Sequence, residues 1–134
     1  MPQRGSSAVT GQTGRAQSAR TDMTIARSKN IGVSPLKMRQ VIDQVRGKSV
    51  AAAESALMYM TSPAADVVLR TVRSAAANAE NNDLLNRAEL KIVRITADQG
   101  PVLKRYQPKA RGRAGSKNRP SCHLTIEVAE ARSN

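Results

Sequence analysis

Residues 103–119, LKRYQPKARGRAGSKNR, decide how this chain can fold. The stretch carries seven Lys and Arg residues, no acidic residue, one Pro and two Gly. It separates two segments that are typical of β-strands, ELKIVRITA at 89–97 and SCHLTIEVA at 121–129. If these strands pair with each other, the stretch between them forms a long β-hairpin. Each of its limbs, at about a dozen residues and about 3.3 Å per residue, reaches on the order of 40 Å, so the tip stands clear of the core.

The two flanking strands differ in regularity. In the second, apolar residues alternate with polar ones, as in a strand with one covered face, and the apolar set is Cys122, Leu124, Ile126 and Val128. In the first, Ile92 and Val93 are adjacent, which indicates either a β-bulge or burial on both faces.

Helix signals precede the strands. A first helix has Ser34 in the N-cap position, Pro35 in its first turn and Gly47 just past its end. A second, shorter helix follows Ser49 and ends near Thr61. Both patterns are bounded on each side, so they predict two separate short helices.

A third helix begins at Ser62 and Pro63 and fades around Asn82. Apolar residues recur at helical spacing in all three helices: Met38, Val41, Ile42 and Val45; Val50, Ala53, Leu57 and Met60; Ala65, Val68, Val72, Ala75 and Ala79. The third helix also has a polar stripe of Arg70, Ser74, Asn78 and Asn81. That stripe either meets RNA or is an ordinary solvated helix face.

The order of elements predicts an α+β fold. Three helices pack on a small antiparallel sheet, and a long basic β-hairpin at about 98–121 protrudes from it. Residues 23–134 are expected to form a single globular domain, because a chain of 134 residues leaves no room for two cores. Residues 1–22 are rich in Gly, Ser, Thr and Gln, so we expect a disordered basic extension there.

The charge balance points to a polyanionic partner. The chain has 22 Lys and Arg against 10 Asp and Glu, a formal charge of +12, which favours nucleic acid over an anionic membrane surface. No apolar run approaches the roughly 20 residues of a membrane span, and residues 1–23 lack the apolar centre of a signal peptide, so we expect a soluble cytoplasmic protein. Only Tyr59 and Tyr106 are aromatic, which favours phosphate and shape contacts over base stacking.

The sequence predicts no catalytic residue, no metal site and no cofactor. Cys122 and His123 are neighbours, but adjacent residues of a strand point to opposite faces and cannot act as a pair. The chain has one Cys and one His, too few for a zinc ligand set. The acidic residues are scattered and no phosphate-binding glycine loop is present. We therefore expect Cys122 to be a small core residue and His123 a surface hydrogen-bond donor.

Within the basic stretch, ARGRAGS at 110–116 predicts a turn, because Gly112 and Gly115 allow either a positive φ or a close approach of the backbone. Pro108 and Pro120 cannot donate ladder hydrogen bonds, which suits an arm that touches a partner. Planar guanidinium forks for phosphate come from Arg111, Arg113 and Arg119. The alternative is a solvated disordered loop, but so long an insertion between strands is uncommon unless it has a function.

Three segments, in this order and spacing, closely resemble the bacterial large-subunit ribosomal protein L-twenty-two family. They are SPLKMRQVIDQVRGKSV at 34–50, SAAANAENN at 74–82 and DQGPVLKRYQPKARGRAGSKNRPSCHLTIEV at 98–128. The resemblance covers roughly residues 26–130. It implies a structural RNA-binding protein without catalysis, whose small α+β domain sits beside the exit of the nascent-peptide tunnel. The hairpin would thread into ribosomal RNA and line that tunnel.

The resemblance assigns ribosomal RNA contacts to two sets of residues. In the hairpin they are Lys104, Arg105, Lys109, Arg111, Gly112, Arg113, Lys117 and Arg119. In the globular domain they are Lys37, Arg39, Arg46, Lys48, Arg70, Arg73, Ser74, Asn78 and Asn82. The residues that would line the tunnel are Lys109, Ala110, Arg111, Gly112 and Arg113.

The resemblance also implies partners. They are large-subunit (23S) ribosomal RNA, ribosomal protein L-four near the tunnel constriction and the nascent peptide, with macrolide antibiotics binding nearby. Neither a membrane nor a homo-oligomer is expected, and the location is the cytoplasmic ribosome. One departure is GSKNRP at 115–120, where relatives generally carry a bulkier apolar residue, so this limb is expected to be more flexible and more polar.

Two other classes of protein fit parts of the pattern. An architectural DNA-binding protein also combines helices with a basic β-arm, and it would be a dimer that bends duplex DNA. A cationic membrane-active protein would need an apolar face beside its charges, and the basic stretch has almost none.

Overall fold

The computed structural model describes residues 23–131, so the extension expected at residues 1–22 lies outside the described part. The helices and strands are β1 (Met23–Ile31), α1 (Pro35–Val45), α2 (Val50–Met58), α3 (Pro63–Asn82), β2 (Leu90–Gln99), β3 (Leu103–Pro108), β4 (Ala114–Arg119) and β5 (Cys122–Glu130). A short 3-10 turn, Arg87–Glu89, leads into β2, and a turn at Ala110–Gly112 joins β3 to β4.

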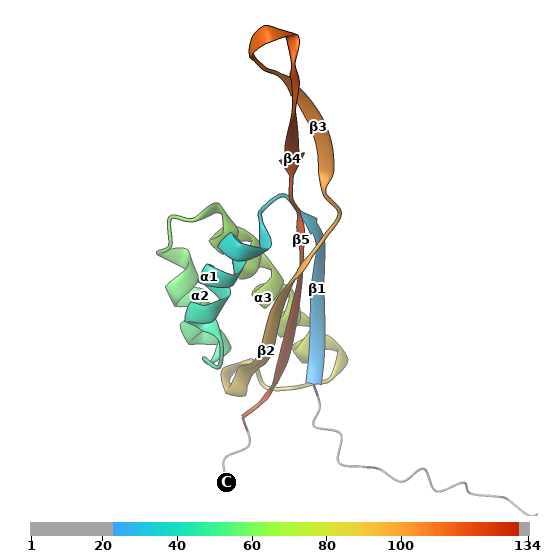
Figure 1. The fold of residues 1–134 in the computed structure, drawn as a ribbon. Coiled ribbons are helices and arrows are strands. Elements are labelled where there is room, and N and C mark those ends of the chain that lie inside the picture. Colours follow the sequence, from blue (N-terminus) through green and yellow to red (C-terminus); the bar gives the residue numbers. More distant parts are fainter. Residues whose placement is uncertain (1–22, 132–134) are drawn as a thin grey trace, which may run out of the picture.

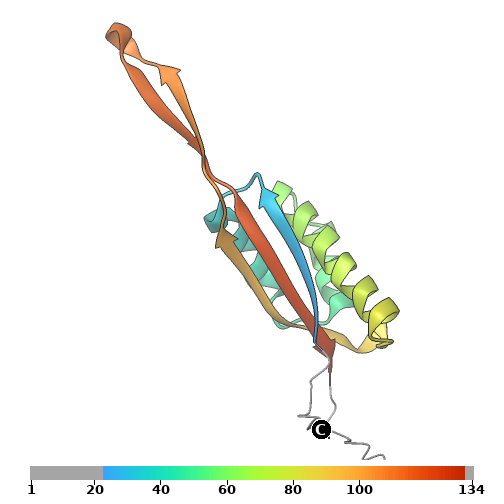
Figure 2. The ribbon, with the colours of Figure 1, turned by 90° about the vertical axis from the view of Figure 1, so that its right-hand side faces the viewer.

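A three-stranded antiparallel sheet in the order β1–β5–β2 forms the centre of the structure. All three helices lie on one face of this sheet (Figure 1 and Figure 2). Helix α3 packs on β1 and β5, whereas α1 packs on β2. The predicted α+β fold, with three helices on a small antiparallel sheet, is confirmed.

The apolar helix faces predicted from the sequence form the core, and only Met60 stays half-buried at its margin. Across from the helices, β5 contributes the side chains of Cys122, Leu124, Ile126 and Val128, all fully buried. Each fully buried Val, Leu or Ile side chain stabilises the fold by about 1.5–3 kcal/mol. Five of the eight buried positions of α3 are Ala, which lets this helix lie close to the sheet although the chain has no Phe or Trp.

The helix boundaries follow the capping signals. The side chains of Ser34 and Ser49 each accept a hydrogen bond from a backbone N–H in the first turn, both at 3.4 Å. Ser62 stands in the same position before α3 but makes no side-chain cap bond. Gly47, just past α1, has φ +75°, a conformation that glycine adopts without steric cost.

The irregular pattern in β2 is a β-bulge, one of the two explanations left open by the sequence. Ile92 pairs with Val128 and Arg94 with Glu127, so Val93 is an extra residue in the ladder. The side chain of Val93 is 52% exposed, which excludes burial on both faces. The extra residue shifts the register of β2 by one, so that the buried side chains that follow the bulge again point toward the helices.

The strand order predicted from the sequence was incomplete, because β1 precedes the first helix. Its inward residues Thr24 and Ala26 are small or polar, whereas Ile25 points away from the core and is 42% exposed. The apolar alternation that reveals a strand is therefore missing from this segment. As a result, β5 is the middle strand of the sheet rather than an edge strand.

Beyond the pair Gln99↔Cys122, the chain leaves the sheet and forms the arm, which we define as residues 100–121. Within it, β3 and β4 pair antiparallel over six residues each. Figure 1 shows the arm projecting past the helices and the sheet, and Figure 2 shows the narrow crossing that joins it to them. The predicted protruding hairpin is thus confirmed as a structural element.

Replacing Val41 by Asp should abolish cooperative folding. Val41 is 5% exposed, and an unpaired charge at such a site costs several kcal/mol against a total stability of about 5–15 kcal/mol. Thermal unfolding followed by circular dichroism measures the loss. Leu36→Asp is the matched control, because Leu36 lies on the same helix and is 72% exposed, so its unfolding free energy should change by no more than about 0.5 kcal/mol. A Val41→Asp protein that melts like the parent would show that the core face of α1 is misassigned.

Candidate nucleic-acid interface

The arm presents its charges to solvent without any internal counter-charge. In β3 and β4 every residue is exposed except Gly115, which is half-buried. The four ion pairs within residues 23–131 all lie in the helices, in the sheet or in the turn before β2, and none includes an arm residue. Among the described residues, the only hydrogen bond from an arm guanidinium runs from Arg105 to the carbonyl of Lys104 at 2.9 Å. The arm cations are therefore available to an external anion.

The register of β3 and β4 sorts the arm side chains onto two faces. Residues that pair directly share a face, and successive pairs alternate between faces. We call one side the cationic face; its pairs are Leu103↔Arg119, Arg105↔Lys117 and Gln107↔Gly115. We call the other side the neutral face; its pairs are Lys104↔Asn118, Tyr106↔Ser116 and Pro108↔Ala114. Sequence reasoning missed this division, because it depends on a register that the sequence did not determine.

Lys109 extends the cationic face toward the tip. A side chain added at Gly115 would meet the stem of Lys109, with Cε 2.7 Å from the added Cβ position. Lys109 therefore folds back over the cationic side of β4, and glycine leaves it room. Of the two glycines in the predicted turn, Gly115 allows a close approach and Gly112 supplies a positive φ of 68°.

The tip is a tight turn with two successive left-handed residues. Arg111 has φ 58° and Gly112 has φ 68°, and the N–H of Arg113 donates to the carbonyl of Ala110 at 3.4 Å. These are the features of a type I′ turn, whose twist matches that of a two-stranded hairpin. The turn lies where the sequence predicted one. A left-handed Arg was not expected, since Asn or Gly usually takes that place.

Two of the basic residues predicted on the globular domain also seal the free edge of β2. The guanidinium of Arg39 donates to the carbonyl of Ala97 at 3.1 Å, and that of Arg46 donates to the carbonyl of Ile95 at 3.4 Å. At the same edge, the N–H of Ile92 donates to the carbonyl of Lys48 at 3.0 Å. Unpaired groups on an edge strand invite pairing with another chain, so these contacts have a structural role of their own.

The remaining predicted residues of the globular domain are mostly free at the surface. Within residues 23–131, the side chains that make no hydrogen bond or ion pair are Lys37, Lys48, Arg70, Arg73, Ser74, Asn78 and Asn82. Asn78 is half-buried and the others are exposed. Because α1 packs on β2 and α3 on β1 and β5, the structure distributes the predicted residues over the arm and two helices rather than one patch.

The adjacent residues Cys122 and His123 differ in burial and in hydrogen bonding. Cys122 is fully buried, and burial raises the pKa of its thiol, as expected for a core residue. His123 is half-buried, and its Nδ1 accepts a hydrogen bond from the N–H of Asn30 at 3.1 Å. Nδ1 is an acceptor here, because the irregular end of β1 directs the N–H of Asn30 toward the ring, and donation from the other ring nitrogen stays a prediction.

The part of the chain from 23 to 131 has neither a metal-binding cluster nor a membrane-spanning helix. No three His, Cys, Asp or Glu side chains gather there in a way that could hold a metal ion. None of the helices there combines the length and the apolar composition needed to cross a bilayer.

Comparisons with known proteins agree on one family. The family described as Ribosomal protein L22p/L17e matches residues 26–129. Proteins named large ribosomal subunit protein uL22 are similar over most of their length. The one from Trichormus variabilis is 50% identical over 111 residues, which cover 81% of this chain and 93% of the relative. The one from Chloroflexus aggregans is 50% identical over 105 residues (78% and 93%), and one from Dehalococcoides mccartyi is 50% identical over 102 residues (76% and 94%).

Removing the guanidinium groups at the edge of β2 should lower stability without any RNA present. Arg39→Ala combined with Arg46→Ala removes two hydrogen bonds to backbone carbonyls, each contributing about 0.5–1.5 kcal/mol. Urea unfolding of the free protein measures the loss. The matched control is Arg70→Ala with Arg73→Ala, which removes the same charge from exposed helix positions and should change stability by less than about 0.5 kcal/mol. Equal effects from the two pairs would show that the edge contacts do not stabilise the sheet.

Proposed function

We propose that this chain, which belongs to the ribosomal protein L22p/L17e family, binds large-subunit ribosomal RNA and extends its arm along the nascent-peptide exit tunnel. It is a structural, non-enzymatic protein of the large ribosomal subunit and serves translation there. The observation that carries the proposal is the cationic face of the arm, whose charges have no internal partner in residues 23–131.

The cationic face suits a phosphate backbone better than it suits the free chain. Arg105 and Lys117 lie directly opposite each other in the ladder, and like charges in that position destabilise a hairpin. Phosphates placed along this face remove the repulsion and accept the guanidinium and ammonium hydrogen bonds. RNA therefore stabilises the arm at the same time as the arm binds RNA, and ordering of the arm is coupled to assembly.

The neutral face has a composition that suits a water-filled passage. Tyr106, Ser116 and Asn118 offer neutral polar groups, and Lys104 is the only charge, close to the base of the arm. A growing peptide passing this face would meet few fixed charges. We therefore propose that the cationic face lies on RNA and that the neutral face and the tip, Lys109 to Arg113, border the tunnel. Lys109 would stand at the boundary between the two, because its side chain extends the cationic face. Ribosomal protein L-four, the nascent peptide and bound macrolides would be neighbours of this tip.

The globular part supplies the anchor. Residues 23–134 would act as one RNA-binding domain, with residues 98–121 as its hairpin and residues 1–22 as a basic extension. The exposed basic residues of α1, of the turn after it and of α3 meet RNA in this proposal, namely Lys37, Arg39, Arg46, Lys48, Arg70 and Arg73, together with the polar residues Ser74, Asn78 and Asn82 of α3. For Arg39 and Arg46, the donors used neither at the edge of β2 nor in the ion pair of Arg46 with Asp43 would face the RNA.

Co-sedimentation with ribosomal subunits tests the proposal directly. The tagged intact chain should stay with the large subunit in gradients washed at high salt. A chain lacking residues 103–119 keeps five residues between β2 and β5, enough for a hairpin loop, so its globular part should still fold. We expect that chain to be retained less well, because the cationic face is gone. An intact protein that washed off the subunit, or that travelled with the nucleoid, would instead support an architectural DNA-binding protein.

The two faces of the arm should differ in their contribution to RNA affinity. Arg105→Gln with Lys117→Gln removes two phosphate contacts, so the slope of log affinity against log salt should fall by roughly 1.4–1.8. Tyr106→Ser with Ser116→Ala alters the adjacent ladder pair, which lies on the neutral face, and should leave the slope unchanged. Filter binding to isolated large-subunit RNA at several salt concentrations gives both slopes. If the neutral-face pair changed the slope as much, the proposal that only the cationic face lies on RNA would be wrong.

A further inference from the structure

A groove of about 690 Å³ lies at the base of the arm, where the arm meets the loop between β1 and α1. Its volume falls in the roughly 300–1,000 Å³ range of sites that hold small molecules. Asn30 near the end of β1 and Gly32 in the loop after it form one side, together with Ser34 at the start of α1. The other side is formed by the two limbs of the arm, which contribute Pro101, Leu103, Lys117, Asn118, Arg119 and Pro120.

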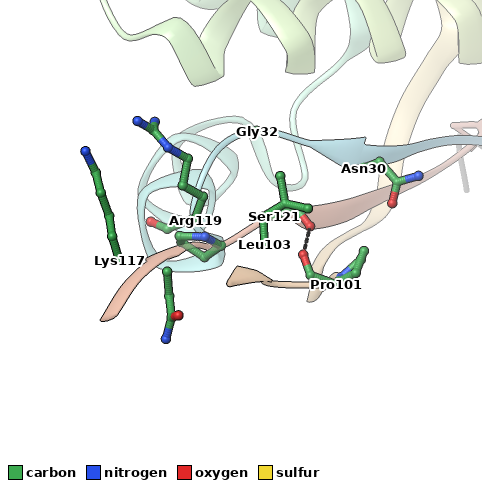
Figure 3. A pocket seen from close by; sticks show the side chains of 10 residues that line it. Asn30, Gly32, Pro101, Leu103, Lys117, Arg119 and Ser121 are labelled. Carbon is green, nitrogen blue, oxygen red and sulfur yellow. Dashed lines mark hydrogen bonds between the residues drawn. The ribbon is translucent and has the colours of Figure 1, made fainter. Parts of the chain in front are cut away.

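The wall on the arm side is held in place by tight backbone contacts. The N–H of Gly100 donates to the carbonyl of Ser121 at 2.8 Å, and the hydroxyl of Ser121 donates to the carbonyl of Pro101 (Figure 3). A Cβ at position 100 would stand 2.8 Å from the Ser121 hydroxyl, so only glycine leaves this arrangement undisturbed. The groove is therefore built into the crossing between sheet and arm.

The lining combines an apolar wall with positive charge. Leu103 is 54% exposed and lies on the cationic face beside its ladder partner Arg119. Figure 3 shows the side chains of Lys117 and Arg119 extending to the same side, the side on which Gly32 lies. Of the residues between 23 and 131, none that lines the groove is acidic. An occupant with one flat apolar part and at least one negative charge would match this surface.

One further group can read the occupant's polar atoms. The hydroxyl of Ser34 accepts the N–H of Lys37 at 3.4 Å, which leaves its own proton free to donate. A base that is splayed out of its helix presents a flat face, a polar edge and a phosphate together.

We propose that this groove holds one unstacked nucleotide of the large-subunit ribosomal RNA. Its base packs against Leu103 and Pro101, and its phosphate meets Lys117 and Arg119. The inference rests on the function proposed above, since it takes the RNA as partner and assigns one nucleotide of it to a defined place. The arm would then be fixed at its base by a single base as well as along its length by charge.

Chemical probing of RNA bases in purified large subunits tests the groove. Subunits are isolated through a tag on the chain, either intact or carrying Leu103→Ser, Arg119→Gln or Leu84→Ser. Leu84 is 86% exposed and lies after α3, outside the groove, so Leu84→Ser is the matched control. One unpaired base should be protected with the intact chain. Its reactivity should rise about fivefold or more, a loss of ~1 kcal/mol of base contact, in Leu103→Ser. The same base should respond to Arg119→Gln and stay protected in Leu84→Ser.

The possible outcomes distinguish a failure of the groove proposal from a failure of the proposed function. If the chain sediments with the large subunit but neither groove variant exposes a single base, the groove proposal is wrong and the RNA-binding function stands. Reactivity that rises at many nucleotides along the arm would likewise overturn it, because it would show general loosening. If the intact chain does not sediment with the large subunit at all, both proposals fail together. Thermal melts of the free variants, expected to match the parent, confirm that the substitutions act on RNA and not on folding.

Discussion

The antiparallel pairing of β2 with β5 is the constraint on which the rest of the structure depends. β5 is the middle strand, so β1 can join the sheet only through it, and the helices pack on the surface that this pairing creates. The same two strands continue into the arm, whose direction is set by their last pair. A chain in which β2 and β5 failed to pair would lose the core and the arm in one step.

The sheet has a free edge, and basic side chains help to cover it. β2 is an edge strand, and its free carbonyls are covered by Arg39 and Arg46. These two arginines belong to the residues that family resemblance assigns to RNA. Each guanidinium has five donors and spends one of them on the edge, so the same side chain can stabilise the sheet and still present donors outward. A basic residue of this protein therefore can have a structural role in the sheet in addition to any contact with RNA.

Much of the fold was readable from the sequence because local signals agreed with one another. Ser–Pro pairs marked the starts of two helices, the spacing of Val and Ala predicted their buried faces, and the adjacent Ile92 and Val93 left a bulge as one of two explanations. β1 was missed for a physical reason, since the inward residues Thr24 and Ala26 carry too little apolar surface to make a pattern. The candidate interface, too, could be predicted only in part. The basic stretch and its turn were visible as composition, whereas the two faces of the arm, the left-handed Arg111 and the groove depend on register and on contacts between distant segments.

The division of the arm into two faces limits how its length can change in evolution. Side chains alternate along each strand, so one residue inserted into β3 alone would turn every later side chain of that limb to the opposite side. Arg105 would then no longer share a side with Lys117, and the charges would be split between both faces. Insertions or deletions that preserve the sidedness must come in matched steps of two residues on both limbs, or else be confined to the turn. Arms of related chains should therefore vary in length by such steps, while substitutions that keep each side chain on its own face remain free.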